Sequence, residues 1–213
     1  MIKINVINLY KYILVFIIMS ILGYFYETIL EIIENLIKYQ KIIFTHHTAV
    51  IYGYMNVIYG LGANIIMLLF MNKNKSLLTI FIQSSLILGL FEFLVSFIQE
   101  GIIGYISWDY SDKFLNIGGR TTIPYMLVWG ISTIIFIKYI YPFLEKVIDK
   151  IPYKLILSYT LLIILLLDNV FTWIILYRRN ERINGIESNS RYDKIIDSVY
   201  NNNYLDEKFP LIK

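Results

Sequence analysis

The sequence predicts an all-α integral membrane protein: a bundle of about five transmembrane helices with a polar re-entrant or lid loop between the third and the fourth. Of the 213 residues, 57% are hydrophobic and only 16% are charged, whereas soluble globular domains carry about 25% charged residues. The mean hydropathy of +0.60 is also high for a soluble protein. A third observation is the division of the apolar residues into long runs separated by charges and prolines.

Five apolar runs approach the roughly 20 residues that a helix needs to cross about 30 Å of hydrocarbon. In chain order they are residues 9–26, 50–71, 77–98, 122–141 and 155–177. Over such lengths in lipid, only helices satisfy their own backbone groups. The first run has no small-residue cleavage site after it, so we expect a retained span. Pro142 and Pro152 bracket the expected link between the fourth and fifth spans.

The chain turns polar from Arg178 onward. We therefore expect a transmembrane helical domain at 1–178 and a polar C-terminal tail at 179–213, with some helix in the tail. An odd number of spans places the two termini on opposite faces of the membrane. The lysine and arginine counts of the two sets of loops are too similar to fix which face is cytoplasmic.

Several classes of site are disfavoured by what the chain lacks. It has no cysteine, which excludes disulfides, a thiol nucleophile and a thiolate metal site. The two histidines, His46 and His47, are adjacent and would point apart on any regular element, so we predict neither a metal site nor a cofactor. The net charge of +3 is too small to indicate a nucleic-acid partner. Without a G-x-x-x-x-G-K-[ST] loop, any ATPase would be a separate polypeptide.

Polar residues within the third run recur with helical period. Ser85, Gly89, Glu92, Ser96 and Glu100 follow one another at steps of four, three, four and four, so they form one stripe that faces protein or water rather than lipid. A carboxylate near the bilayer centre costs about 2.5–3.5 kcal/mol even on a lenient scale. We therefore predict a functional role for Glu92.

Other polar positions leave two interpretations open. Gly53, Asn56, Gly60 and Ala63 make a small face on the second run that suits close packing of a neighbouring helix. Asp168, near the middle of the last run, is either part of a site or a carboxylate that fixes the register of neighbouring helices. In the first run, Glu27 lies deep enough to join a site, whereas the glutamates after it fit a helix that is leaving the membrane.

The stretch WDYSDKFLNIGGR, residues 108–120, is too polar to cross a bilayer. It falls on the same predicted face as Glu27, Glu92 and Glu100, and Arg120 is a natural partner for those carboxylates. The glycine pair near its end permits a sharp bend or a close approach to a ligand. We predict that this stretch is a lid over a polar cavity.

These residues resemble the type IV ABC-transporter permease family of bacterial multi-pass membrane proteins. Members share a Gly-Tyr/Trp-x-Tyr-Glu element, here residues 23–27, and a Pro-x-Tyr-Gly-like element, here 50–53 with Val50 in place of proline. They also share a glutamate-bearing third span, a Trp-Asp-Tyr-Ser segment followed by Asn and Gly-Arg, here within 108–120, and an aspartate like Asp168. The resemblance covers roughly residues 12–182 and implies a transport protein of the bacterial cytoplasmic membrane.

The function predicted from these features is a permease-like membrane transport component with a cavity lined by carboxylates and an arginine. Its partners would be the lipid bilayer and either a separate ATPase subunit or a second copy in a homodimer, because five spans make a small path. Two alternatives are an intramembrane enzyme acting on lipid or envelope precursors and a non-catalytic sensor or assembly protein. The absence of a committed catalytic motif disfavours the enzyme. The candidate binding residues are Glu27, Tyr52, Glu92, Glu100, Trp108, Asp109, Tyr110, Asp112, Asn116, Arg120 and Asp168.

Overall fold

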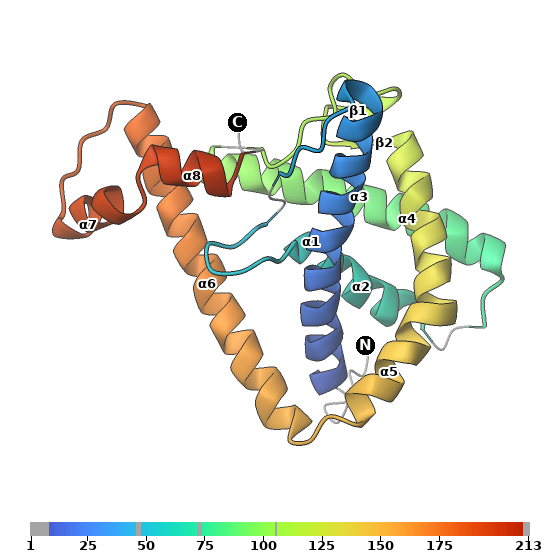
Figure 1. The fold of residues 1–213 in the computed structure, drawn as a ribbon. Helices are drawn as coiled ribbons and strands as arrows, with labels where there is room; N and C mark the ends of the chain where they lie inside the picture. The colour runs from blue at the N-terminus through green and yellow to red at the C-terminus, as the bar shows by residue number, and fades with distance from the viewer. Residues whose placement is uncertain (1–8, 46–47, 72–73, 105, 211–213) are drawn as a thin grey trace.

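The structure is a computed structural model that describes residues 9–45, 48–71, 74–104 and 106–210 (Figure 1). Four helical stretches of this part of the chain are long and apolar enough to cross a membrane. They are α1 (Leu9–Tyr39), α3 (Leu77–Ile103), the continuous stretch from α4 (Ile123–Ile135) to α5 (Tyr141–Asp149), and α6 (Lys154–Ile183). The prediction of an all-helical membrane protein is thereby confirmed. His46 and His47 lie outside the described residues.

The second expected span differs from the prediction. Only α2 (Val57–Phe70) is helical, and its 14 residues extend about 21 Å at 1.5 Å per residue, short of the membrane core. The prediction of a helix over all of 50–71 is wrong for residues 50–56, which are irregular. Gly53 has φ of 151°, and Asn56 has an extended conformation at the start of α2, so neither residue continues a helix backwards.

The fourth span is longer than expected because the helix passes through Pro142. A π-helical segment, η2 (Phe136–Ile140), joins α4 to α5 and widens the turn that precedes the proline. Pro142 is the second residue of α5 and directly follows this π-helical turn. The expected break at Pro142 is therefore wrong. Pro152 does lie in a break, and α6 begins at Lys154.

Neighbouring spans pack through glycines. Gly60 of α2 lies so close to Phe16 and Ser20 of α1 that a Cβ atom there would overlap both residues. Gly89 of α3 lies equally close to Met126 of α4. Gly60 and the buried Ala63 thus form the packing side of α2 and set its distance from α1, whereas the prediction of one helical face is wrong for Gly53 and Asn56, which precede the helix.

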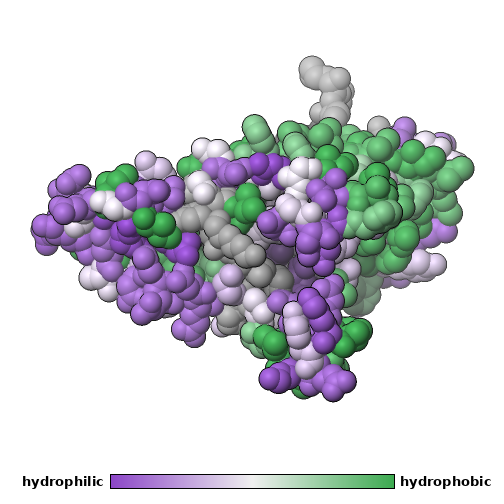
Figure 2. All heavy atoms as spheres, turned by 90° about the horizontal axis from the view of Figure 1, so that it is seen from above, coloured by the Kyte–Doolittle hydropathy of each residue, from purple (hydrophilic) through white to green (hydrophobic). Residues whose placement is uncertain are grey.

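The two ends of the molecule carry different elements. The N-terminal end of α1 lies beside α5 and the start of α6, where Lys11 forms an ion pair of 2.7 Å with Glu145 (Figure 1). At the opposite end lie the last turns of α1, the hairpin of β1 (Asn116–Ile117) and β2 (Thr121–Thr122), and the C-terminal segment (Figure 1). Figure 2, a view of that end, shows hydrophilic side chains over the C-terminal segment at the left and hydrophobic ones at the right.

The C-terminal segment is ordered and packed. It contains α7 (Arg191–Val199) and α8 (Asn202–Lys208). Tyr200, Leu205 and Phe209 are buried against Ile51 and Ile175 in a small core of their own. The predicted division into a membrane domain at 1–178 and a tail at 179–213 stays a prediction, since α6 continues through that boundary.

Candidate functional site

Glu92 is the most buried carboxylate of α3. Its side chain is on the predicted polar stripe, which faces α4 and the loop before it, and the residue is 6% exposed. One carboxylate oxygen accepts a hydrogen bond of 2.6 Å from the hydroxyl of Thr121, and the other accepts one of 3.5 Å from the hydroxyl of Tyr110. Both partners are neutral, so they stabilise the carboxylate without cancelling its charge.

Glu27 of α1 is the second carboxylate of this region. It accepts a short hydrogen bond from the hydroxyl of Tyr59 in α2. Burial raises the pKa of Tyr110 well above its usual range, and the negative charges of Glu92 and Glu27 raise it further. Tyr110 therefore remains a protonated donor between two acidic side chains.

We call Glu27, Tyr59, Glu92, Tyr110 and Thr121 the glutamate cluster. Four elements and the lid loop bring these residues together, although they are far apart in the sequence. Aromatic rings from α4 close the cluster: Trp129 lies 5.5 Å from Tyr59 and Tyr125 lies 4.8 Å from Tyr110, between ring centroids. Within the described part of the chain, no ion pair involves either glutamate.

Arg120 belongs to a neighbouring, more exposed group. It forms a short ion pair with Glu100 and donates a hydrogen bond of 3.1 Å to Ser96, while its guanidinium lies over the rings of Phe93 and Phe97. The expected pairing with the carboxylates of this face holds for Glu100 but is wrong for Glu27 and Glu92. Since the side chain of Glu100 is 47% exposed, this pair contributes at most about 1 kcal/mol.

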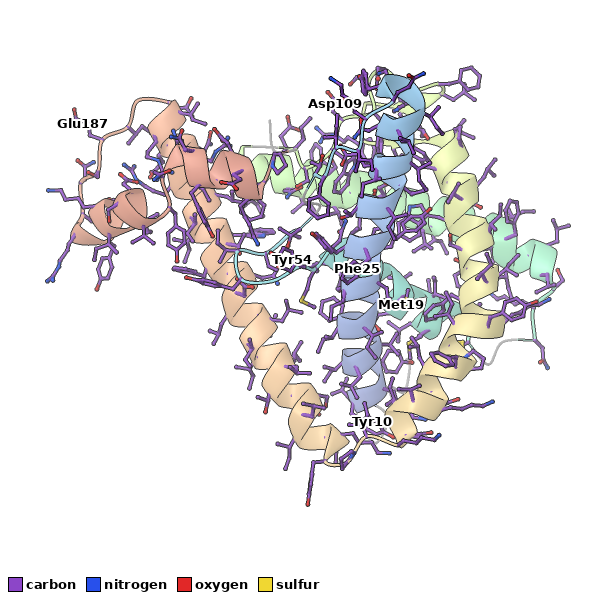
Figure 3. All side chains as sticks on the ribbon, viewed as in Figure 1. Tyr10, Met19, Phe25, Tyr54, Asp109 and Glu187 are labelled. Atoms are coloured by element: carbon purple, nitrogen blue, oxygen red, sulfur yellow. The ribbon has the colours of Figure 1, made fainter. Side chains whose placement is uncertain are left out.

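The stretch 108–120 is a loop that leads into the β1–β2 hairpin, at the end of the molecule where Asp109 is labelled (Figure 3). Trp108 donates from its indole to the carbonyl of Arg120 at 2.8 Å, and the side chain of Asn116 bonds to Ser111, Lys113 and Gly119. Asp109 accepts from the backbone and hydroxyl of Ser111, and Asp112 is exposed. Trp108, Asp109 and Asn116 thus shape the loop, while Tyr110 is the member that reaches the glutamate cluster.

The glycine pair has the role expected of it. Gly118 and Gly119 have φ of 57° and 69°, in the left-handed region that favours glycine. A Cβ atom on Gly119 would also overlap the hydroxyl of Ser111. These glycines make the sharp turn that precedes Thr121.

Asp168 lies in a second polar group, around residues 48–56, which we call the 48–56 loop. Its two carboxylate oxygens accept from the backbone N–H of Tyr52 at 3.2 and 3.3 Å. Thr172, one turn later, accepts from the N–H of Ile51 at 2.9 Å. Asp168 therefore holds an irregular backbone rather than the register of two helices, and both Asp168 and Tyr52 lie apart from the glutamate cluster.

The 48–56 loop lies at the depth of the long helices. Asp168 is about 21 Å along α6 from Lys154 at 1.5 Å per residue. Figure 3 accordingly shows Tyr54 between α6 and α1 at mid-height, well below Asp109. At such a depth in a membrane, irregular backbone persists only where protein groups satisfy it, as Asp168, Thr172 and the hydroxyl of Thr48 do here.

Residues 14–173 match the sequence model of the family described as "Putative ABC-transporter type IV". The chain belongs to this family. No curated protein and no solved structure matches it. Both polar groups lie within the residues that match the type IV family, whereas the C-terminal segment lies beyond them.

In this type IV protein the C-terminal segment contacts the 48–56 loop. The hydroxyls of Tyr52 and Tyr200 share a short hydrogen bond, and Lys208 donates to the carbonyl of Gly53 at 3.3 Å while lying over the ring of Tyr54. Burial lowers the pKa of Lys208, against the opposing effect of the nearby charge of Asp168. Burial and the contact with Tyr52 raise the pKa of Tyr200 to about 12.

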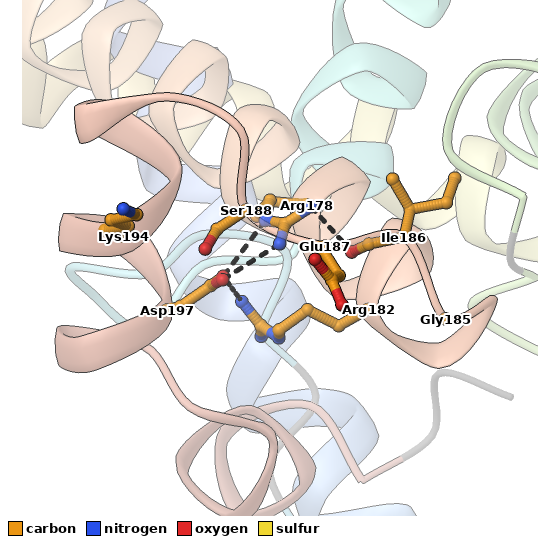
Figure 4. A pocket seen from close by; sticks show the side chains of 8 residues that line it. All are labelled: Arg178, Arg182, Gly185, Ile186, Glu187, Ser188, Lys194 and Asp197. Carbon is orange, nitrogen blue, oxygen red and sulfur yellow. Dashed lines mark hydrogen bonds and ion pairs between the residues drawn. The ribbon is translucent and has the colours of Figure 1, made fainter.

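Three arginines at the end of α6 hold this segment, and we call them the arginine clamp: Arg178, Arg179 and Arg182. Arg178 binds both oxygens of Asp197, at 3.0 and 2.9 Å (Figure 4). It also binds Glu181. Arg182 binds Asp197 at 2.5 Å, and Arg179 binds Asp206. The hydrogen bonds from Arg178 and Arg182 lower the pKa of Asp197. Arg178 and Arg182 border an open hollow of about 540 Å³, but their guanidinium groups already bind carboxylates of the protein itself.

Sequence reasoning missed Tyr59, Thr121, Trp129 and the arginine clamp. Thr121 directly follows the Gly-Arg pair, so its place at the mouth of the fourth span was a usable signal. Tyr59 precedes Gly60, and a Cβ atom on Gly23 would overlap the Tyr59 ring. The contact between Gly23 of α1 and Tyr59 of α2 joins residues far apart in the sequence. No pattern near either residue predicts it.

Proposed function

We propose that the protein is a permease-like membrane transport component whose glutamate cluster takes up a cation, a proton included. The observation that carries the proposal is the burial of Glu92 beside Glu27, with only neutral donors, three hydroxyls and the indole of Trp129, as described partners. Two carboxylates that share a poorly solvated site repel each other, and either a proton or a bound cation relieves the repulsion. Such a site suits a solute cation or a coupling proton.

The architecture supports a path through the membrane made of five crossings. The 48–56 loop and α2 together form the second crossing, so that one crossing is half irregular and half helical. Transporters build substrate and ion sites around discontinuous helices of this kind. The family description supports transport as well, and the chain has no nucleotide-binding loop of its own. We propose a separate ATPase subunit or a second copy as partner, in the bacterial cytoplasmic membrane.

The position of Arg120 weighs against the enzyme alternative. An enzyme acting on phosphorylated lipid precursors would need an arginine close to the buried acids to hold the phosphate. Arg120 instead binds Glu100 and Ser96, and lies over Phe93 and Phe97. A purely structural role for the glutamate cluster is the alternative that experiment has to exclude.

The substitution Glu92→Gln tests the cation site. Glutamine keeps the size and most of the hydrogen bonding but removes the charge, so we expect the variant to fold and insert normally. Wild-type protein in detergent should gain thermal stability from monovalent cations or from mild acid, and Glu92→Gln should lose that dependence together with cation flux in proteoliposomes. Glu100 lies on the same stripe but is half exposed. Glu100→Gln should therefore keep the cation dependence of thermal stability and change the cation flux by no more than about twofold, as expected of a solvated pair. Wild-type flux and wild-type cation dependence in Glu92→Gln would reduce the cluster to a structural lock.

The five-crossing path is tested separately by accessibility. The chain has no cysteine, so single cysteines can be placed at Lys41, Lys113, Asn189 and Asn74, all of which are exposed. The first three should react with an impermeant thiol reagent from one side of the membrane, and Asn74→Cys from the other side only. Labelling of Lys113→Cys and Asn74→Cys from the same side would rule out this path.

A further inference from the structure

We propose that α7 lies in the headgroup layer of the membrane, with its apolar face inserted and with Arg191 and Lys194 bound to anionic lipid headgroups. This would make the C-terminal segment a peripheral lipid-binding element as well as a packing partner of the 48–56 loop. The inference does not depend on what the protein transports.

The first observation is an uncovered apolar face on α7. Tyr192, Ile195 and Val199 are 79%, 51% and 56% exposed. Their spacing of three and four residues places them on one side of the helix. Ile196, on the adjoining side, packs against the small core that holds the segment. The helix therefore has one apolar side that serves the protein and another that meets its surroundings.

The second observation is the distribution of charge. Both acidic residues of α7 are used internally: Asp193 closes a capping box with Ser190, and Asp197 binds the arginine clamp. Arg191 and Lys194 are exposed, and no ion pair joins either of them to another described residue. The outward charge of the helix is therefore positive, which is complementary to anionic lipid.

The third observation is the depth at which α7 is held. About 20 helical residues cross the hydrocarbon, so a span that starts at Lys154 leaves it near Ile174. Asp197 is bound to Arg178, about 36 Å from Lys154 along α6 and so just past the hydrocarbon edge. Ile174 and Tyr177 are exposed on α6 at this height, and Figure 1 shows α7 beside the upper part of α6.

A lipid surface fits these three observations together. A helix with an apolar side, a basic edge and a fixed place at the membrane boundary has the properties of interfacial helices. The exposed side chains of α6 and α7 then form one lipid-facing surface. A protein partner would need no basic edge at this particular height.

The test uses a polarity-sensitive fluorophore on a single cysteine at Ile195, with the protein alone in a nanodisc. Lipids that carry a doxyl quencher near the headgroup should quench this label about threefold more than a label at Asn189. Iodide, a quencher dissolved in the water, should quench the label at Asn189 more than the label at Ile195. Equal quenching at the two positions would overturn the proposal, and so would protection of the Ile195 label from both quenchers, which would indicate a protein occupant.

The role of charge needs a second comparison. In discs that contain anionic lipid, the double substitution Arg191→Gln, Lys194→Gln should lower doxyl quenching at Ile195 to the level seen with neutral lipid. The control is Lys113→Gln in the lid loop, which should leave the quenching unchanged. If the double variant keeps the wild-type dependence on anionic lipid, the two cations do not bind headgroups and the proposal fails.

Discussion

Arg178→Ala is expected to release the C-terminal segment from α6 and to lower the free energy of unfolding by about 1.5–3 kcal/mol, the range for hydrogen bonds to charged groups. Arg178 is 4% exposed, and its guanidinium binds both oxygens of Asp197, one oxygen of Glu181 and the carbonyl of Ile186. The variant would leave these four acceptor atoms, on three residues, without this donor. Arg182 alone would then hold Asp197.

Thermal unfolding in detergent measures this effect, with Arg191→Ala as the control. Arg191 is exposed on α7, so its removal should shift the midpoint little. Limited proteolysis should cut the released segment between α6 and α7 in the Arg178 variant first. If the two variants unfold at the same temperature, the clamp does not stabilise the protein.

The same pair of variants gives a dependence on pH. Hydrogen bonding from Arg178 lowers the pKa of Asp197 in the folded protein. A group with a depressed folded pKa stabilises fully above its unfolded pKa, about 3.9 for aspartate, and loses that contribution as the pH falls through the folded value. The stability gap between wild type and Arg178→Ala should therefore be constant near neutral pH and narrow only in strong acid.

Run length and helical period were sufficient to predict much of the fold. Apolar runs of about 20 residues identify spans because hydrocarbon thickness sets the length. The stripe from Ser85 to Glu100 identified the face of α3 that meets α4, because one side of a helix can be read from spacing alone. The π-helical turn before Pro142 could not be read in this way, since it depends on how the chain accommodates the proline ring.

Partners across the fold were less predictable. The charges near Arg120 indicate that it pairs with a carboxylate, but they do not say which one. Arg120 ends the glycine turn and Thr121 begins β2, and their side chains point in different directions. Thr121 turns inward to Glu92, and Arg120 turns outward to Glu100.

The irregular backbone of the 48–56 loop could not be predicted from the local sequence either. Composition makes residues 50–71 one apolar run, and an apolar run in lipid is expected to be helical. Residues 50–56 are not helical because side chains of α6, more than a hundred residues away, accept hydrogen bonds from the N–H groups of Ile51 and Tyr52. Nothing local to the run records those acceptors. The loop should accordingly depend on them.

Asp168→Ala is therefore expected to unfold the 48–56 loop selectively. The N–H of Tyr52 would lose its acceptor at a depth where water cannot replace it, at a cost of about 1–3 kcal/mol for a buried donor left unsatisfied. Adding Thr172→Val removes the acceptor of Ile51 as well and should roughly double the loss. Because Tyr52 and Gly53 contact Tyr200 and Lys208, the C-terminal segment should loosen in the same variants.

Hydrogen exchange followed by mass spectrometry resolves this outcome by segment. Peptides that cover 48–56 and 200–209 should exchange faster in Asp168→Ala, and faster again in the double variant, while peptides from α3 and α4 keep their wild-type protection. Thr160→Ala is the matched control, since Thr160 is exposed on the same helix and should alter neither segment. Unchanged exchange at 48–56 in the double variant would show that the loop keeps its shape without α6. Asp168 would then be available to bind a ligand, and its role as a backbone acceptor would have to be abandoned.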